Sequence, residues 1–262
     1  MFREERQEKI LQYINTHKTV KVTDLANIFK TSVVTIRSDI TELSNNGMIV
    51  KVHGGAFAIS DRYNLEIPSR AKARQNNSAK LIVGQLAAEM VEENDIIILD
   101  SGSTTLEVAR AIRNRRVTII TNDIQIGVLL ASGNQGHLNL ITTGGTVEPF
   151  TYTQSGVEAL DFLKRLRVNK LFLGCDAIDP QKGMSNRTLL EASIKKAMID
   201  VAEQVIAVVD SSKHNKEVFI HVCGVDAIDV LVTEKISKAN REQFEEAGVV
   251  VVLPPQQKQQ EH

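Results

Sequence analysis

Residues 20–56 contain a short helix, a tight turn, a second helix and a hairpin, and this run restricts the possible folds more than any other part of the chain. Four apolar residues of the first helix recur at the three-and-four spacing of one buried helix face. They are Val22, Leu25, Ala26 and Phe29. Ser32 follows a break in this pattern and can cap the N-terminus of the next helix. The run therefore predicts a helix-turn-helix.

The second predicted helix has an unusual outer face. Its buried stripe consists of Ile36, Ile40 and Leu43, and at about 100° per residue the opposite side carries small hydroxyls and one aliphatic side chain. These outward residues are Val34, Thr35, Ser38 and Thr41. Small side chains allow close approach to base edges in a DNA major groove, and Arg37 beside them is available for a guanine or a phosphate. Taken alone, the helix fits an ordinary helical hairpin with a mildly polar face equally well.

A short hairpin follows the second helix and favours DNA binding over an ordinary helical hairpin. Residues 48–52 and 56–59 are predicted strands joined by a glycine-containing turn, and a hairpin directly after a recognition helix is a wing. Lys51 and His53 lie where a wing touches the phosphate backbone, and Gly54 permits close approach. No Cys or second His lies at ligand spacing from His53, so we expect no metal there. The candidate DNA contacts are Ser32, Val34, Thr35, Arg37, Ser38, Thr41, Lys51, His53 and Gly54.

Composition places the chain among globular proteins. Its 262 residues suffice for one or two domains, and 42% apolar and 24% charged residues are typical of a soluble protein. The net charge is only −1, and the first sixty residues carry eight Lys and Arg against six Asp and Glu. This argues against a protein coated in basic surface, so the prediction of nucleic-acid binding depends on the motif and not on bulk charge.

The cysteines, the N-terminus and the length of the apolar runs restrict the cellular compartment and the chemistry of the protein. Cys175 and Cys223 lie far apart without a CxxC pattern, which predicts reduced, buried thiols. The N-terminus is charged from its third residue, unlike a signal peptide, and no apolar run approaches the ~18 residues of a membrane span. We therefore expect a soluble, cytoplasmic protein that uses no membrane partner, cofactor or metal.

From residue 78 onward, short apolar strands alternate with helices. Strands are expected at residues 95–100, 117–120, 138–141, 170–173, 205–209, 230–232 and 249–253. Continuous apolar strands separated by helices are typical of a mostly parallel sheet covered on both faces, which is an α/β fold. The predicted organisation is a winged helix-turn-helix domain (1–59), a polar linker (60–77), an α/β domain (78–255) and a disordered tail (256–262).

Ligands bind such sheets at the carboxyl ends of the strands. Four polar loops follow predicted strands, at residues 101–105, 121–123, 143–146 and 210–213. The first enters a helix, so its hydroxyls and backbone N–H groups can surround an anion, and Lys213 can add a charge for a phosphate. Asp176 and Glu191 can accept hydrogen bonds from sugar hydroxyls. Any single loop is explained by turn and cap preferences, but four at one edge favour a phosphorylated polyol site.

Two common phosphate motifs are missing from the sequence. No G-x-G-x-x-G follows a strand, and there is no Walker A sequence, so neither a dinucleotide site nor an ATP-driven function is expected.

The chain resembles the DeoR family of bacterial transcriptional regulators along residues 3–253. In the N-terminal part the resemblance lies in VTDLANIF, VTIRSDI and GMIVKVHGGA, and in the second part in ILDSGSTTLEVA, IITND, ITTGG, LFLGCDAID and VVDSSK. Two positions depart from the family pattern. Ser38 stands where many members have a second Arg, which bears on base preference, and Ala177 stands where many have Gly, which bears on the width of the pocket.

What the resemblance implies is a sensor domain that is similar in fold to ribose-5-phosphate isomerase and binds a phosphorylated sugar as inducer. The implied effector residues are Ser101, Gly102, Ser103, Thr104, Thr105, Asn122, Gly144, Gly145, Asp176, Glu191 and Lys213. The leading hypothesis is a repressor of a carbohydrate operon, for an amino sugar, a hexitol or another sugar. It would bind double-stranded operator DNA as a homodimer or homotetramer and be released by the sugar phosphate.

Two alternatives remain open from the sequence. Asp176, Glu191 and Lys213 are chemically adequate for proton transfer beside a carbonyl, as in a sugar-phosphate isomerase with a DNA-binding appendage. A transcriptional activator would have the same residues and differ only in the sign of its effect. The winged module favours sensing over catalysis, so an enzyme is not expected.

Overall fold

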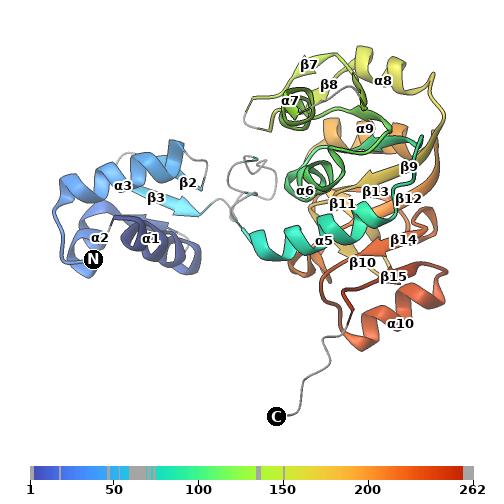
Figure 1. The fold of residues 1–262 in the computed structure, drawn as a ribbon. Coiled ribbons are helices and arrows are strands. Elements are labelled where there is room, and N and C mark those ends of the chain that lie inside the picture. The colour runs from blue at the N-terminus through green and yellow to red at the C-terminus, as the bar shows by residue number, and fades with distance from the viewer. Residues whose placement is uncertain are drawn as a thin grey trace, which may run out of the picture. The chain divides into compact units, whose positions relative to one another are not determined.

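The computed structural model describes residues 3–17, 19–45, 48–52, 54–58, 69, 72, 75–133, 137–149 and 151–255. The chain forms two compact units, Met1–Arg74 and Gln75–His262 (Figure 1). His53, most of the predicted linker and the predicted tail at 256–262 lie outside the described residues. Each unit is therefore considered by itself.

The N-terminal unit is a winged helix-turn-helix. Its elements are α1 (Arg3–His17), β1 (Thr19–Lys21), α2 (Val22–Ile28), α3 (Val33–Asn45), β2 (Ile49–Val52) and β3 (Gly55–Ala58). The strands form an antiparallel sheet in the order β1-β3-β2. Ile10 and Ile14 of α1, Leu25 of α2, and Ile36 and Ile40 of α3 are at most 1% exposed and form the core between the helices and the sheet. The predicted helices and wing are confirmed, and β1 is an additional strand that the sequence pattern did not indicate.

The C-terminal unit is built on a parallel seven-stranded sheet in the order β15-β14-β12-β9-β4-β5-β6. These strands are β4 (Ile96–Leu99), β5 (Thr118–Thr121), β6 (Asn139–Thr142), β9 (Val168–Leu173), β12 (Ala202–Val208), β14 (Val230–Val232) and β15 (Val250–Val252). All seven were predicted from their apolar runs. The predicted α/β fold is confirmed.

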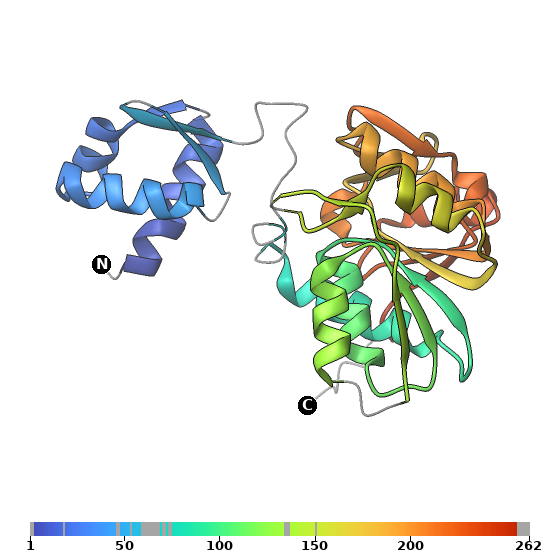
Figure 2. The same ribbon diagram turned by 90° about the horizontal axis from the view of Figure 1, so that it is seen from above.

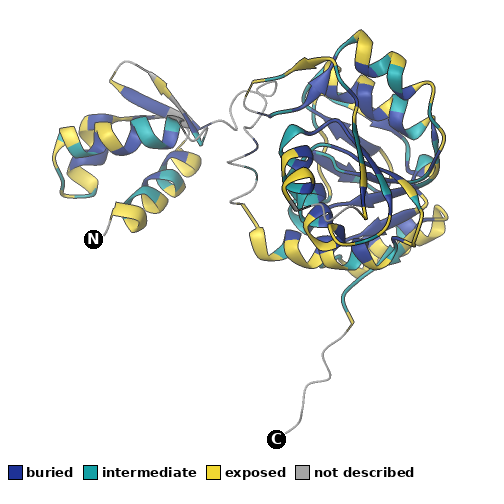
Figure 3. Ribbon diagram, turned by 45° about the horizontal axis from the view of Figure 1, so that its top comes forward, coloured by how far each residue is buried: buried dark blue, intermediate teal, exposed yellow. Residues whose placement is uncertain are grey.

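Helices cover both faces of this sheet (Figures 1 and 2). One face carries α5 (Asn77–Glu89), α6 (Ser103–Ile112) and α7 (Ile124–Gly133), and the other carries α8 (Val157–Leu163), α9 (Leu189–Ile199) and α10 (Lys238–Glu246). Neighbouring strand residues alternate between the two cores: Ile97 and Leu99 face α5 to α7, whereas Ile98 faces the other side. The central strands are mostly buried, the outer strands β6 and β15 are partly exposed, and the helices are exposed on their outer faces (Figure 3).

A second, antiparallel sheet was not predicted. Its strands are β10 (Ala177–Asp179), β11 (Gly183–Asn186) and β13 (Ile220–Cys223), and β7 (Thr146–Val147) pairs with β8 (Gln154–Ser155) in a further hairpin. All four residues of β11 are buried, but glycine, serine and asparagine among them give no apolar pattern to detect. Helix α9 follows this strand and begins at Leu189, with Thr188 as its N-cap.

Candidate DNA-binding surface and effector site

The recognition helix α3 presents the side that its sequence predicts. The Thr35 N–H donates a 3.1 Å hydrogen bond to Ser32 Oγ, which confirms Ser32 as the N-cap. The Val34 side chain is 74% exposed, and Arg37 and Ser38 are also exposed, while Ile36 is fully buried on the opposite side. The outer face is therefore free for a partner surface.

The wing and α3 are joined by side chains. Lys51 Nζ of β2 donates a 2.8 Å hydrogen bond to Thr41 Oγ1, and that hydroxyl donates to the Arg37 carbonyl at 2.6 Å. Gly54 has a positive φ of 82°, and its carbonyl accepts from the Val22 N–H at 3.0 Å. At neighbouring Gly55 a β-carbon would lie 2.3 Å from the Val20 carbonyl oxygen, so only glycine lets β3 approach β1 this closely.

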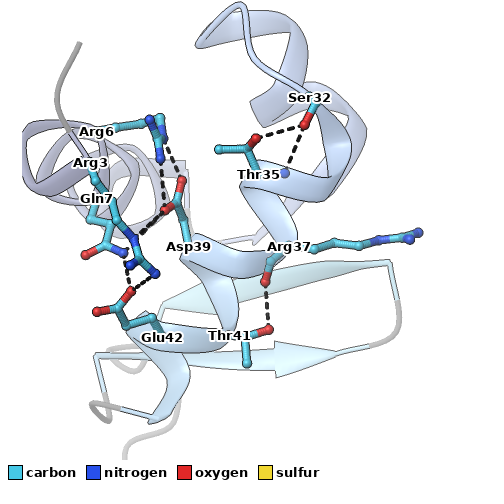
Figure 4. A network of polar contacts seen from close by, with 9 residues as sticks. All are labelled: Arg3, Arg6, Gln7, Ser32, Thr35, Arg37, Asp39, Thr41 and Glu42. Carbon is cyan, nitrogen blue, oxygen red and sulfur yellow. Dashed lines mark hydrogen bonds and ion pairs between the residues drawn. The ribbon is translucent and has the colours of Figure 1, made fainter.

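A polar network fixes α3 against α1 (Figure 4). Arg6 donates to both carboxylate oxygens of the buried Asp39, from Nε at 2.6 Å and from Nη2 at 3.2 Å. Gln7 donates to Asp39 at 3.3 Å and to Glu42 at 2.7 Å, and Arg3 pairs with Glu42. Arg37 extends away from this network (Figure 4), so its guanidinium remains available to DNA. Arg6 and Asp39 thus hold the recognition helix in place, a role that the sequence analysis did not assign.

The second candidate site lies at the carboxyl edge of the parallel sheet. The chain order reverses between β4 and β9, so the loops after these two strands lead in opposite directions, and ligands of such sheets bind at this kind of position. The loops predicted from sequence follow β4, β5, β6 and β12, and Asp176 follows β9. These five strands are neighbours, so the tertiary structure brings the predicted effector residues of their loops to one edge, and Glu191 lies in the first turn of α9. We call this edge the effector site.

The loop after β4 is held by the loop after β5. Asp123 Oδ2 accepts from the Gly102 N–H at 3.2 Å, and Asp123 Oδ1 accepts from the Gln125 and Ile126 N–H groups at 2.7 and 3.3 Å. Burial raises the pKa of Asp123 to about 6, although these hydrogen bonds favour its charged form. Ser101, Ser103 and Thr104 are half-buried beside this contact. Thr105 is fully buried, and its hydroxyl donates to the Gly102 carbonyl at 2.8 Å.

A buried ion pair lies between β4 and β9, where the chain order reverses. Lys195 of α9 pairs with Asp100 at the end of β4 and donates to the Gly174 carbonyl after β9 at 3.0 Å. Asp100 Oδ2 also accepts from the Gly174 N–H at 3.0 Å. Burial by itself lowers the pKa of Lys195, but Asp100 and Glu191 outweigh it and raise that pKa above its usual value. Lys195 therefore stays cationic and links β4 to β9, the two strands between which the chain order reverses.

Polar residues of β11 and α9 line the next part of the site. Asn186 Nδ2 donates to Glu191 Oε2 at 2.9 Å, and Arg187 Nε lies 3.8 Å from Asp176 Oδ2. Asp176, Asn186 and Glu191 are buried, and the Arg187 side chain is 18% exposed. Two carboxylates, an amide and a guanidinium in one place provide the mixed donors and acceptors that sugar hydroxyls need.

The outermost loops of the site differ in character. Lys213 ends the 3-10 helix η2 (Ser211–Lys213), which Asp210 caps by accepting from the Ser212 N–H at 3.2 Å. Gly144 and Gly145 follow β6 with positive φ values of 72° and 92°. A β-carbon on Gly145 would lie 2.3 Å from the Ser155 carbonyl oxygen, so the close approach of that strand already requires this glycine.

Several buried polar atoms of the effector site have no hydrogen-bond partner among the described residues. They include Asp100 Oδ1, Asn122 Oδ1, Asn186 Oδ1 and Asp210 Oδ2. The four residues are at most 3% exposed. Buried polar atoms are nearly always paired in native proteins, because an unpaired one loses its hydration without compensation. Their concentration at one edge indicates a place for a polar ligand.

Four residues of the site were not predicted from the sequence: Asp100, Asn186, Arg187 and Lys195. Asp123 lies in the predicted polar loop at 121–123 but was given no role. Two of the four unpredicted residues had a signal. Asp100 ends the apolar run IIIL directly before a glycine loop, and Lys195 lies one turn after Glu191 on the helix face that also carries the buried Ala192 and Met198. A lysine on a buried face needs a partner, but the sequence does not say which one.

Metal binding and thiol chemistry find little support in the described residues. No group of three or more His, Cys, Asp or Glu side chains there is placed to hold a metal ion. Both cysteines are free thiols, and burial raises the pKa of Cys175 to about 12 and that of Cys223 to about 11, so neither is an activated nucleophile. Of the helices that the structure describes, none combines the length and the apolar character needed to cross a membrane.

Comparison with known proteins matches both units to one family. Residues 6–62 match the family described as DeoR-like helix-turn-helix domain, and residues 75–235 match the DeoR C terminal sensor domain. The chain is 34% identical over 252 residues to an Escherichia coli O157:H7 protein provisionally named an aga operon transcriptional repressor, with 95% of this chain and 93% of the relative covered. It is 31% identical to the HTH-type transcriptional regulator GlpR of Haloferax volcanii, with 95% and 96% covered.

Solved structures resemble part of the chain. Ribose 5-phosphate isomerase A from Methanocaldococcus jannaschii is 20% identical with a TM-score of 0.40, and the alignment covers 53% of this chain and 55% of that chain. The chain thus spans about half the length of this structure, and the fold assignment depends on the parallel sheet itself. The two family matches and the full-length relatives show that the chain belongs to the DeoR family of transcriptional regulators, with a DNA-binding winged helix-turn-helix and a C-terminal sensor domain.

Proposed function

We propose that this protein is a transcriptional repressor of a carbohydrate operon and that a phosphorylated sugar, bound at the effector site, releases it from its operator. The observation that carries the proposal is the group of unpartnered buried polar atoms at the sheet edge. Asp100 precedes the loop that leads into α6, and Asp210 lies on the loop that carries Lys213. A helix N-terminus and a lysine suit a phosphate, and buried carboxylates and amides suit hydroxyl groups.

The sign of regulation is proposed from relatives. The E. coli relative is named a repressor, and so is the transcriptional repressor AccR of Agrobacterium fabrum, which is 31% identical over 88% of this chain. A single winged module offers little specific surface, so we propose that the protein binds repeated half-sites as a homodimer or homotetramer. We place it in the cytoplasm, where operator DNA is accessible.

The effector is proposed to bind without turnover. Asp176 faces Arg187, and Glu191 accepts the Asn186 amide, so both carboxylates already take part in polar contacts within the site. Sensing requires only that the effector binds the DNA-free state more tightly than the DNA-bound state. A difference of about 1–3 kcal/mol is typical of such coupling.

Fluorescence anisotropy of the full chain on DNA from its own upstream region tests the proposal. Glucosamine 6-phosphate, sorbitol 6-phosphate and fructose 6-phosphate are titrated into the complex, with inorganic phosphate and the three unphosphorylated compounds as controls. Product formation is followed in parallel by chromatography. We expect one phosphorylated compound to release the DNA and to remain unchanged.

Three results would contradict parts of this proposal. Turnover of a compound without any effect on DNA would assign the C-terminal unit to an enzyme. Release by an unphosphorylated compound alone would remove the phosphate requirement. Tighter operator binding in the presence of a compound would make it a co-repressor, and transcription from the operator in vitro would then settle whether the protein represses.

A further inference from the structure

The sensor unit begins at the effector site itself. Gln75 is its first residue, directly after the other unit ends at Arg74. Asn76 precedes α5, and its Nδ2 donates a 3.1 Å hydrogen bond to Asp210 Oδ1, 134 residues further along the chain. Lys80, one turn into α5 and 4% exposed, donates from Nζ to the Gln75 carbonyl. Side-chain hydrogen bonds therefore hold both of the first two residues of the sensor unit.

Asp210 is also part of the loop that carries Lys213. Its Oδ1 accepts from the Ser212 N–H at 3.2 Å and from the Ser212 hydroxyl, in addition to Asn76. Its Oδ2 is buried and has no hydrogen-bond partner among the described residues. One carboxylate thus caps η2 with one oxygen, holds the start of α5 with the same oxygen, and leaves the other oxygen for a ligand.

The backbone at Asn76 is set for this contact. Its φ of 54° is left-handed, a conformation that asparagine adopts more readily than most residues, and its carbonyl accepts the first helical hydrogen bond of α5 from the Lys80 N–H at 3.1 Å. The side chain that reaches Asp210 and the backbone that starts α5 therefore belong to one residue. A shift of Asp210 changes the place where the chain enters the sensor unit.

We propose that the Asn76–Asp210 hydrogen bond couples occupancy of the effector site to the segment that leads from the DNA-binding unit. This inference rests on the proposed function, because it states how effector binding is coupled to operator binding. An effector that engages η2 or donates a hydroxyl to Asp210 Oδ2 reorients the carboxylate and changes its bond to Asn76. Operator binding and effector binding then influence each other through this contact, and by linkage to the same degree in both directions.

The variant Asn76→Gly tests the coupling without disturbing the backbone. Glycine adopts a positive φ without strain, so only the amide contact is lost. The matched control is Asn77→Ala, which removes an amide from the adjacent exposed residue. For each full-length variant, operator Kd is measured with and without whichever of glucosamine 6-phosphate, sorbitol 6-phosphate and fructose 6-phosphate releases the wild-type complex. The Kd of that compound is measured for the free protein.

We expect Asn76→Gly to bind the operator alone and the compound alone as the wild type does. The effect of the compound on operator Kd, about 5–150-fold in typical allosteric proteins, should fall to about twofold or less. Asn77→Ala should keep the full effect. Full release of Asn76→Gly from the operator would overturn the proposal, and so would equal losses in both variants.

A second measurement needs no effector and separates this inference from the proposed function. Hydrogen exchange of the free protein reports on the Lys80 amide in α5 and the Ser212 amide in η2. In Asn76→Gly both amides should exchange faster than in the wild type, because each is bonded to one partner of the contact. If the Ser212 amide keeps its wild-type exchange rate, loss of the Asn76 contact does not affect Asp210. The proposal is then wrong, whichever compound the protein binds.

Discussion

Lys51 Nζ on the wing donates a 2.8 Å hydrogen bond to Thr41 Oγ1 on the recognition helix. The Thr41 hydroxyl in turn donates a 2.6 Å hydrogen bond to the Arg37 carbonyl. Two residues predicted to touch DNA separately are therefore held together before any DNA is present. An ammonium has three donors, so Lys51 retains two for a phosphate. The wing and α3 present one surface, which lowers the entropy cost of binding.

The first prediction concerns Lys51. Lys51→Ala removes a phosphate contact and should weaken binding to all DNA sequences alike. It should also reduce the slope of log Kd against log salt concentration by about one. Anisotropy at several salt concentrations measures both. Lys9→Ala, which removes an exposed lysine of α1 paired with Glu5, is the control and should leave the slope unchanged. An unaltered slope in Lys51→Ala would exclude Lys51 from the backbone contacts.

The second prediction concerns Arg37. Arg37→Ala should weaken operator binding by about 1–3 kcal/mol if the guanidinium reads a base. Its effect on random-sequence DNA should then be much smaller. Arg37→Lys should lose most of the same affinity, because an ammonium cannot form the bidentate contact. Equal losses on operator and random DNA would assign Arg37 to a phosphate, and no loss on either would remove it from the interface.

The third prediction concerns the Arg6–Asp39 pair. The Arg6 side chain is 14% exposed and that of Asp39 is 1% exposed, so Arg6→Ala leaves the buried Asp39 carboxylate with only the weaker contacts of Gln7 at 3.3 Å and Arg3 Nε at 3.8 Å. The N-terminal unit should lose up to about 3–5 kcal/mol of stability, measured by urea unfolding of the full chain. The exposed pair of Lys9 and Glu5 should be worth at most about 1 kcal/mol, so Lys9→Ala is again the control.

A double variant completes this test. Replacing both partners, with Arg6→Met and Asp39→Leu, removes the buried charge and should recover most of the lost stability. If the double variant is as unstable as Arg6→Ala, packing of the Arg6 stem and not its charge holds α1 against α3.

The fourth prediction concerns Lys213. Lys213→Ala should abolish release of the operator by the effector while operator affinity stays unchanged, because the lysine is proposed to hold the phosphate of the effector. Lys235→Ala removes a lysine from the loop after the neighbouring strand β14 and should respond normally. Operator anisotropy with and without the active sugar phosphate compares the two. A normal response in Lys213→Ala would rule out Lys213 as the phosphate anchor.

The fifth prediction concerns pH. The pKa of Asp123 is raised to about 6, compared with about 3.9 in an unfolded chain. Between these values the folded protein binds more protons than the unfolded one, so the contribution of Asp123 to stability is greatest below about pH 4 and declines as the pH rises to about 6. The decline amounts to about 2–3 kcal/mol. Unfolding free energies at pH 4 and pH 7 should therefore differ less in Asp123→Asn than in the wild type.

The outcome that contradicts the pH prediction is a wild-type difference between pH 4 and pH 7 that Asp123→Asn reproduces. Asparagine cannot ionise, and its single oxygen can accept from the Gln125 and Ile126 N–H groups while its NH2 group, a donor, faces the Gly102 N–H. The change with pH is thus the informative quantity, and the absolute stability of the variant is not.

Local patterns in the sequence determined the secondary structure that matters for function. The outer face of α3, the Ser32 cap and the wing were all predictable, because a helix face or a hairpin is specified by residues a few positions apart. The seven strands of the parallel sheet were predictable for the same reason, and their carboxyl ends indicated the effector site. The family resemblance named further residues at this edge.

Only the tertiary structure decided which side chains meet. Arg6 and Asp39 are 33 residues apart, Asp100 and Lys195 are 95 apart, and Asn76 and Asp210 are 134 apart. No local periodicity links such pairs, because their proximity follows from strand order and from how helices pack on the sheet. The sheet of β10, β11 and β13 escaped prediction because three of the four buried residues of β11 are glycine, serine and asparagine, which give no apolar pattern, and its neighbour β13 is distant in sequence.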